Sequence, residues 1–241
     1  MSTNSYLQLG SVEVLVVRKP IKNLHLSVLP PAGRVRVTSP ENMKDDAIRT
    51  LIAIRLPWIK RQQGKFAGQE RQLPREYKTR ESHYYQGKRY LLRVIETETK
   101  QRVVLRGKTY IDMFVRKETS KEKRHELMNE WYREQLKKQI PDLLEKWEKK
   151  IGVKANDWGV KLMKTKWGSC NVESKRVWLN LELAKKPVQC FEYILMHELV
   201  YLKERHHNER FMAYMEKYLP HWKQLKTELN RLPVSHADWK Y

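Results

Sequence analysis

Residues 197–211 read HELVYLKERHHNERF, and the interpretation of the whole chain depends on this stretch. It begins with His197 and Glu198, in the spacing of an HExxH motif, whose two histidines lie four residues apart on one helix face. In such motifs the histidines bind zinc and the glutamate acts as general base. Here the second histidine position holds Tyr201, and a further pair, His206 and His207, follows.

The helix that carries this stretch is expected to begin at Pro187, because proline is favoured at a helix N-terminus. Its later turns are apolar apart from His197 and Glu198. Burying an ionisable pair is costly unless the pair has a partner. Zinc would be one such partner, and nearby donors such as Lys164 or Ser169 are the alternative.

A third ligand is offered by the histidine pair. His207 follows Tyr201 by six residues at an expected helix end, where the chain can turn back towards His197. Asn208 can cap the next helix and so fix the backbone that carries His207. Three protein ligands and a water are typical of a catalytic zinc site. His206 is a rival for this ligand role, and a polar turn between helices is the alternative for the pair.

Composition limits the class of protein. The chain has 241 residues, of which 40% are hydrophobic, and this is enough for one large domain or two small ones. No apolar run reaches the roughly 18 residues of a membrane-spanning helix, and we expect no signal peptide. Two cysteines, Cys170 and Cys190, are too few for a disulfide framework, so we expect a cytoplasmic protein with reduced thiols.

The chain is strongly basic, with a formal net charge of +21. Residues 55–80 are a local concentration, with eight basic and two acidic side chains. Such a surface suggests nucleic acid or another polyanion as a partner. A well-solvated basic surface is the alternative, since no zinc-finger, RNP or GxxG motif accompanies the charge.

Alternating apolar residues predict an α+β fold whose first part, residues 1–117, is rich in strands and has one helix. An antiparallel sheet is expected within 11–38, then a helix up to about residue 59, then an exposed connector over 60–80. Four further strands are expected at 82–85, 90–95, 101–105 and 110–115.

Residues 118–241 are predicted to form a second, more helical domain. A helical period runs over 121–152, with Pro141 expected to break or kink it and Gly152 to cap it. An antiparallel hairpin is expected around Gly168, pairing 158–166 with 176–183. The remaining features are a second His-Glu pair at 125–126, read as solvent-facing, and a packing helix over 221–232.

Four motifs in order resemble the YgjP-like metallopeptidase family. They are WYREQL (131–136), MKTKWGSCN (163–171), LNLELAKKP (179–187) and HELVYLKERHHNERF (197–211), and the resemblance covers nearly the whole chain. It implies a zincin-like metallopeptidase domain over 118–241, a zinc cofactor, and a protein or peptide substrate. Members of the family are similar to SprT-like proteases and are often found beside restriction-modification genes.

The resemblance implies a role for each site residue. His197 matches the first zinc ligand, Glu198 the general base, and His207 the third ligand, while Tyr201 stands where the second histidine is expected. In zincins a strand beside the active-site helix pairs with an extended substrate, and residues 167–171 are expected beside the metal.

Tyr201 leaves three explanations open: weakened or lost metal binding, a working site with a tyrosinate or only two histidines, and a metal-free binding protein. A catalytically inactive, nucleic-acid-associated protein on the same fold is therefore the alternative function, and a hydrolase of a non-peptide substrate is a further one.

Overall fold

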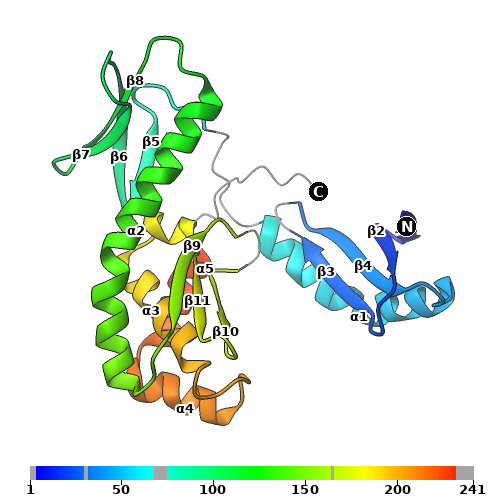
Figure 1. Cartoon of the computed structure of the whole chain (residues 1–241). Helices are drawn as coiled ribbons and strands as arrows, with labels where there is room; N and C mark the ends of the chain where they lie inside the picture. Colours follow the sequence, from blue (N-terminus) through cyan, green and yellow to red (C-terminus); the bar gives the residue numbers. More distant parts are fainter. Residues whose placement is uncertain (1–3, 30–31, 68–74, 164–165, 232–241) are drawn as a thin grey trace. The chain divides into compact units, whose positions relative to one another are not determined.

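The computed structural model describes residues 4–29, 32–67, 75–163 and 166–231, and the chain divides into two compact units (Figure 1). The first unit contains four strands and one helix, and the second contains the remaining elements. Both units combine helices with strands, so the predicted α+β class is confirmed.

The first unit is a four-stranded sheet covered by a long helix. Its elements are β1 (Asn4–Leu9), β2 (Val12–Lys19), β3 (His25–Leu29), β4 (Arg34–Pro40) and α1 (Asp45–Ala67). The strand order is β1-β2-β4-β3. Alternate valines of β2 and β4 face α1 and form the core of this unit with Ile48, Ile52 and Ile59.

Two predictions for this unit are wrong. The sheet is mixed rather than antiparallel, because β2 pairs with β4 in parallel; residue alternation identifies strands but not their neighbours. The expected connector over 60–80 is helical as far as Ala67. Ile59 is buried in the core of this unit, and Gln63 Nε2 donates a hydrogen bond to the Gly33 carbonyl at 2.9 Å. Both interactions hold the helix on the sheet.

The second unit begins with another four-stranded sheet covered by a helix. The strands β5 (Ser82–Tyr85), β6 (Lys88–Glu96), β7 (Arg102–Arg106) and β8 (Tyr110–Val115) confirm the predicted strands, and the helix is α2 (Lys121–Ile151). The order is β5-β6-β8-β7, with β6 and β8 parallel.

The first sheet and the second have the same connectivity. Each has an antiparallel outer pair, a central parallel pair and a second antiparallel outer pair, and each is followed by a helix. The buried residues also match, since Val14 and Val16 of β2 and Tyr90 and Leu92 of β6 are the third and fifth residues of their strands. The chain therefore contains one ββββα arrangement twice.

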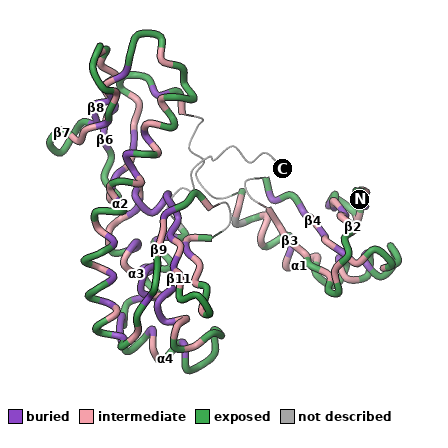
Figure 2. Tube along the Cα trace, viewed as in Figure 1, coloured by how far each residue is buried: buried purple, intermediate pink, exposed green. Residues whose placement is uncertain are grey.

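Helix α2 runs without interruption through Pro141, so the predicted break there is wrong. Leu136, Ile140 and Leu144, which flank the proline on both sides, are buried in one core, and this packing outweighs the lost backbone donor. The ends agree with prediction: the Ser120 side chain caps the start, and Gly152 caps the end with φ 72°. Buried positions recur along the whole helix (Figure 2).

The remaining elements complete the second unit, and α2 contacts β9, η1 and α3 among them. They are β9 (Asp157–Lys161), β10 (Gly168–Asn171), β11 (Arg176–Asn180), the 3-10 helix η1 (Leu181–Lys185), α3 (Val188–Val200), α4 (Glu209–Tyr218) and α5 (Trp222–Arg231). The predicted hairpin around Gly168 is wrong. Gly168 lies in β10, which is antiparallel to β11, whereas β9 is parallel to β11. The turn of the hairpin therefore falls at residues 172–175.

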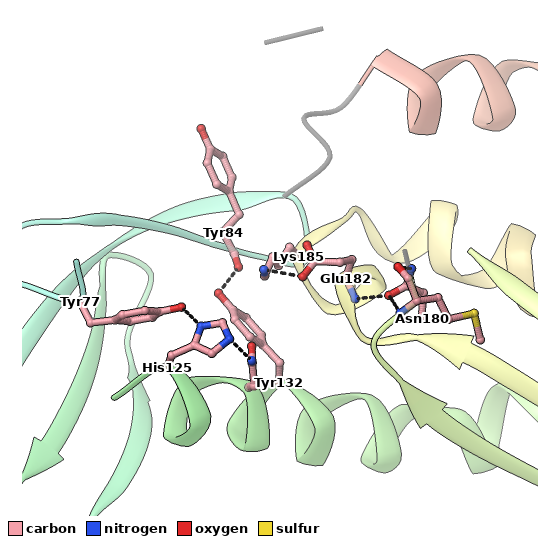
Figure 3. A network of polar contacts seen from close by, with 9 residues as sticks. Tyr77, Tyr84, His125, Tyr132, Asn180, Glu182 and Lys185 are labelled. Carbon is pink, nitrogen blue, oxygen red and sulfur yellow. Dashed lines mark hydrogen bonds and ion pairs between the residues drawn. The ribbon is translucent and has the colours of Figure 1, made fainter. Parts of the chain in front are cut away.

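The compact units differ from the domains expected from sequence, 1–117 and 118–241, because the division falls between α1 and β5. The sheet β5–β8 shares one apolar core with α2 and the later elements. Polar contacts also hold these parts together, as Tyr132 of α2 donates to the Tyr84 carbonyl of β5 at 2.8 Å. Figure 3 shows this region, with Tyr77 and His125 at one end and Asn180, Glu182 and Lys185 at the other.

None of the helices in the described ranges has the length and apolar character needed to cross a membrane.

Candidate active site

Helix α3 presents His197 and Glu198 on its last turns, as the sequence predicts. The helix begins after Pro187, and nine of its thirteen residues are buried. Glu198 is 5% exposed and His197 is half-buried. Tyr201 follows directly as the C-terminal cap residue, so its ring lies one turn beyond His197.

The structure brings together the side chains of His197, Tyr201 and His207. The Nε2 atoms of His197 and His207 lie 3.3 Å apart. The Tyr201 hydroxyl forms a 2.7 Å hydrogen bond with His207 Nε2. The three side chains predicted as metal ligands are thus in mutual contact.

The backbone that carries His207 is held by the next helix. The Asn208 side chain accepts from the Phe211 amide at 3.0 Å and caps α4, as expected. The buried Phe211 ring lies with its centroid 4.6 Å from that of His207 and 5.0 Å from that of His197. Phe211 is therefore a structural support for both histidines, a role that the sequence did not reveal.

His206 has a different place from His207. It is exposed, and its backbone amide donates to Glu204 Oε1 at 3.3 Å. Within the described ranges, no contact is recorded between the His206 side chain and His197, Tyr201 or His207. Of the two histidines, His207 is thus the one whose side chain contacts His197 and Tyr201.

The Glu198 carboxylate lies against the backbone of β10. A Cβ atom added at Gly168 would lie 2.7 Å from both Glu198 Cγ and Oε1. In the part of the chain that is described, Glu198 Oε2 is buried without a hydrogen-bond partner. Glycine at position 168 is therefore what lets the edge strand approach the carboxylate.

Burial shifts the pKa values of the site residues. It raises the pKa of Glu198 to about 8, against the opposing effect of Lys166. It lowers the pKa of His197 to about 4, with His207 and Lys226 acting in the same direction, so His197 is a neutral imidazole at pH 7. Burial, with the nearby Glu198 and Cys170, raises the pKa of the Tyr201 phenol to about 12.

The cluster opens into a cleft of about 1070 Å³. One wall is the edge strand β10, and another is α5, whose Trp222, Lys226 and Leu229 line the cleft. The packing helix expected over 221–232 is confirmed, since Trp222, Leu225 and Leu229 are buried. The sequence did not indicate that this helix also bounds the site.

Cys170 lines the same cleft from β10 and is half-buried. Burial and the nearby Glu198 raise the pKa of its thiol to about 11. A protonated thiol is a poor nucleophile, so Cys170 acts as a wall residue.

The residues present fit zinc at two of three protein positions. Two nitrogens bound to one tetrahedral zinc stand roughly 3.3–3.4 Å apart, which matches the separation of the histidines. The third position is a phenol that already hydrogen-bonds His207. Among the described residues, no group of three His, Cys, Asp or Glu side chains could hold a metal ion. The departure from a three-ligand site therefore rests on Tyr201.

Three further features of the sequence analysis are Lys164, Ser169 and the second His-Glu pair. Lys164 is outside the described residues, and Ser169 lines the cleft. The second His-Glu pair is on the exposed side of α2, where His125 Nδ1 contacts the Tyr77 hydroxyl at 2.5 Å and Nε2 contacts Asn129 at 2.8 Å (Figure 3). It takes no part in the cleft.

His197 and Glu198 near the end of α3, His207 from the segment before α4, and the residues of β10 beside Glu198 therefore line one cleft. The family model described as "YgjP-like, metallopeptidase domain" matches residues 22–232. The chain belongs to the YgjP-like metallopeptidase family.

Two solved metallopeptidase zymogens are similar to parts of the chain. Abylysin from Pyrococcus abyssi is 24% identical over 39% of this chain and 99% of its own, with a TM-score of 0.35. Jannalysin from Methanocaldococcus jannaschii is 20% identical over 37% and 92%, with a TM-score of 0.34. No curated protein matches the sequence.

Proposed function

We propose that the protein is a zinc-dependent metallopeptidase-like hydrolase of protein or peptide substrates, in which Tyr201 reduces zinc occupancy and activity. The observation that carries the proposal is the 3.3 Å separation of His197 and His207 Nε2 beside the Glu198 carboxylate. This separation suits a shared metal, and the family supplies the reaction class.

The chemistry divides between the metal and the chain. Zinc, when bound by His197 and His207, would polarise the scissile carbonyl and favour ionisation of water. Above its raised pKa of about 8, the ionised Glu198 would accept a proton from the attacking water and pass it to the leaving amine. Its buried position against Gly168 keeps the carboxylate at one place for both transfers.

The substrate is proposed to bind as an extended chain along β10. This strand is at the edge of its sheet, so within the described ranges one side of its backbone has no strand neighbour. Edge strands bind peptides through main-chain hydrogen bonds. Residues 168–171 line the same cleft as His197 and Glu198, and a peptide paired there would pass the candidate ligands.

The test is metal analysis of the purified protein and of Tyr201→His. The unsubstituted chain, with Tyr201, is expected to carry less than one zinc, because a phenol with a raised pKa is a poor ligand. Tyr201→His should bind close to one zinc and hydrolyse an unfolded protein substrate. Adding His207→Ala to Tyr201→His should remove both the metal and the activity.

His206→Ala in the Tyr201→His background is the matched control, and it should retain zinc. If Tyr201→His binds no more metal than the unsubstituted chain, the ligand assignment is wrong. If it binds zinc but hydrolyses neither peptides nor proteins, the ligand set stands and the peptidase activity is wrong.

The second candidate is a nucleic-acid-associated binding protein without catalysis, and the net charge of +21 together with Tyr201 supports it. Under either function the two free cysteines, Cys170 and Cys190, suit a reducing compartment such as the cytoplasm.

A further inference from the structure

The outer face of the β5–β8 sheet is the surface of interest. Alternate residues of β6, β7 and β8 are buried towards α2, so their neighbours point to the other side. We call that side the arginine face. Its defining residues are Arg89 and Arg93 on β6, Arg102 and Arg106 on β7, and Tyr110, Asp112 and Phe114 on β8.

The guanidinium groups of two arginines of this face lie over aromatic rings. The guanidinium carbon of Arg93 is 4.4 Å from the centroid of the Tyr110 ring, and that of Arg102 is 4.2 Å from the centroid of Phe114. A guanidinium held on one side by a ring offers its other side to a further planar group. The rings therefore fix two cationic planes before any ligand binds.

The face carries excess positive charge. The carboxylate of this face is Asp112. It accepts hydrogen bonds from Arg93 at 2.7 and 2.9 Å, and its Oδ2 lies 3.3 Å from Arg106 Nε. Arg89 and Arg102 form no ion pair with any carboxylate of the described residues. Four arginines against one aspartate leave a net charge of +3.

Solvent reaches this face. Tyr110 is 37% exposed, and the side chains of Arg93 and Arg106 are 43% and 58% exposed. Arg89 and Arg102 are also exposed. A ligand could thus reach the charges and the ring edges together.

We propose that the arginine face binds single-stranded nucleic acid, without regard to sequence. Phosphates would contact the arginines, and unpaired bases would stack on the guanidinium and aromatic planes. An acidic polypeptide would satisfy the charges but would make no use of Tyr110 and Phe114. A duplex keeps its bases stacked within the helix, so it would also leave these planes unused. This inference is independent of hydrolysis at the candidate active site.

The experiment titrates the full chain with a fluorescent oligothymidylate of about ten nucleotides, a length within the range of known single-strand sites. Affinity is measured by anisotropy over a series of salt concentrations. R102Q/R106Q should lower the slope of log K against log salt by about 1.4, because each phosphate contact on a single strand contributes about 0.7. Y110L/F114L should weaken binding about tenfold at one salt concentration and leave the slope unchanged.

K137Q/K138Q is the matched control, since it removes two exposed cations from α2. If it lowers the slope as much as R102Q/R106Q, attraction is general and the arginine face is not the site. If polyglutamate or a duplex of the same length competes as well as the single strand, and Y110L/F114L binds like the unsubstituted chain, the nucleic-acid assignment is overturned. A thermal melt of each variant shows that it is folded, and R102Q/R106Q decides the charge contribution even if Y110L/F114L unfolds.

Discussion

At the scale of single residues, the site depends on contacts that a motif does not express. The sequence indicated His197, Tyr201 and His207 as candidate ligands, and the structure brings these three side chains into contact. It did not indicate Phe211, which packs on both histidines, or the contact between Gly168 and Glu198. Such contacts join residues far apart in the chain, and local patterns carry no information about them.

Gly168→Ala is expected to displace the Glu198 carboxylate, because the new Cβ would lie 2.7 Å from Glu198 Cγ and Oε1. In the Tyr201→His background, peptide hydrolysis should fall by about 100-fold or more, as when a general base is lost. Zinc content should stay the same, since neither histidine is touched. Gly64→Ala in α1 is the control: its Cβ meets nothing within 4 Å, so activity should not change. Equal hydrolysis by both variants would contradict the role given to Gly168.

At the scale of elements, most helices and strands could be predicted, and their pairing could not. Alternation predicted β2 to β8, yet the parallel pairing of β2 with β4 depends on which strands become neighbours. The end of α1 and the passage of α2 through Pro141 depend on packing, which overrides local signals. For the same reason residues 168–171, where the sequence indicates the turn of a hairpin, form the strand β10.

Asn180 is expected to hold the segment that leads into β10. Its Nδ2 donates to the carbonyls of Met163 at 2.9 Å and Lys166 at 2.7 Å, and its Oδ1 accepts from the Glu182 amide at 3.2 Å. Asn180→Leu would remove the partner of the buried Glu182 amide and of the part-buried Met163 and Lys166 carbonyls, so the free energy of unfolding should fall by roughly 2 kcal/mol or more. Urea unfolding measures the change.

Asn156→Ala is the matched control for Asn180→Leu, because the amide of Asn156 makes an exposed 3.3 Å hydrogen bond to the Ser174 carbonyl. Its effect should be below about 1 kcal/mol. A loss for Asn180→Leu as small as that of the control would show that the segment is held by other contacts.

At the scale of the whole molecule, the sequence suggested a boundary after residue 117, where strands give way to helices. The structure divides the chain between α1 and β5. A change in composition marks a change of element type, whereas a unit is defined by its shared core. Tyr85 of β5 packs on Trp131 of α2 with ring centroids 5.1 Å apart, across the expected boundary.

A fragment of residues 72–237 is therefore expected to unfold in one cooperative transition, because it keeps the core of the second unit intact. A fragment of residues 118–237 should be unfolded or aggregated, since it would expose Met128, Trp131 and Tyr132 to water. Circular dichroism during heating distinguishes the two. Cooperative melting of the shorter fragment would restore the boundary expected from sequence.

The repeated ββββα arrangement differs between its two copies in the length of the helix. Helix α1 has 23 residues and α2 has 31, so α2 is longer by eight residues, or about 12 Å. Those last residues include Trp147, whose indole donates to Glu192 of α3 at 2.9 Å, and Lys150, which donates to the Tyr218 carbonyl of α4 at 2.9 Å. The last two turns of α2 therefore brace α3 and α4, the two helices between which His207 is held, so shortening α2 to the length of α1 would remove both contacts.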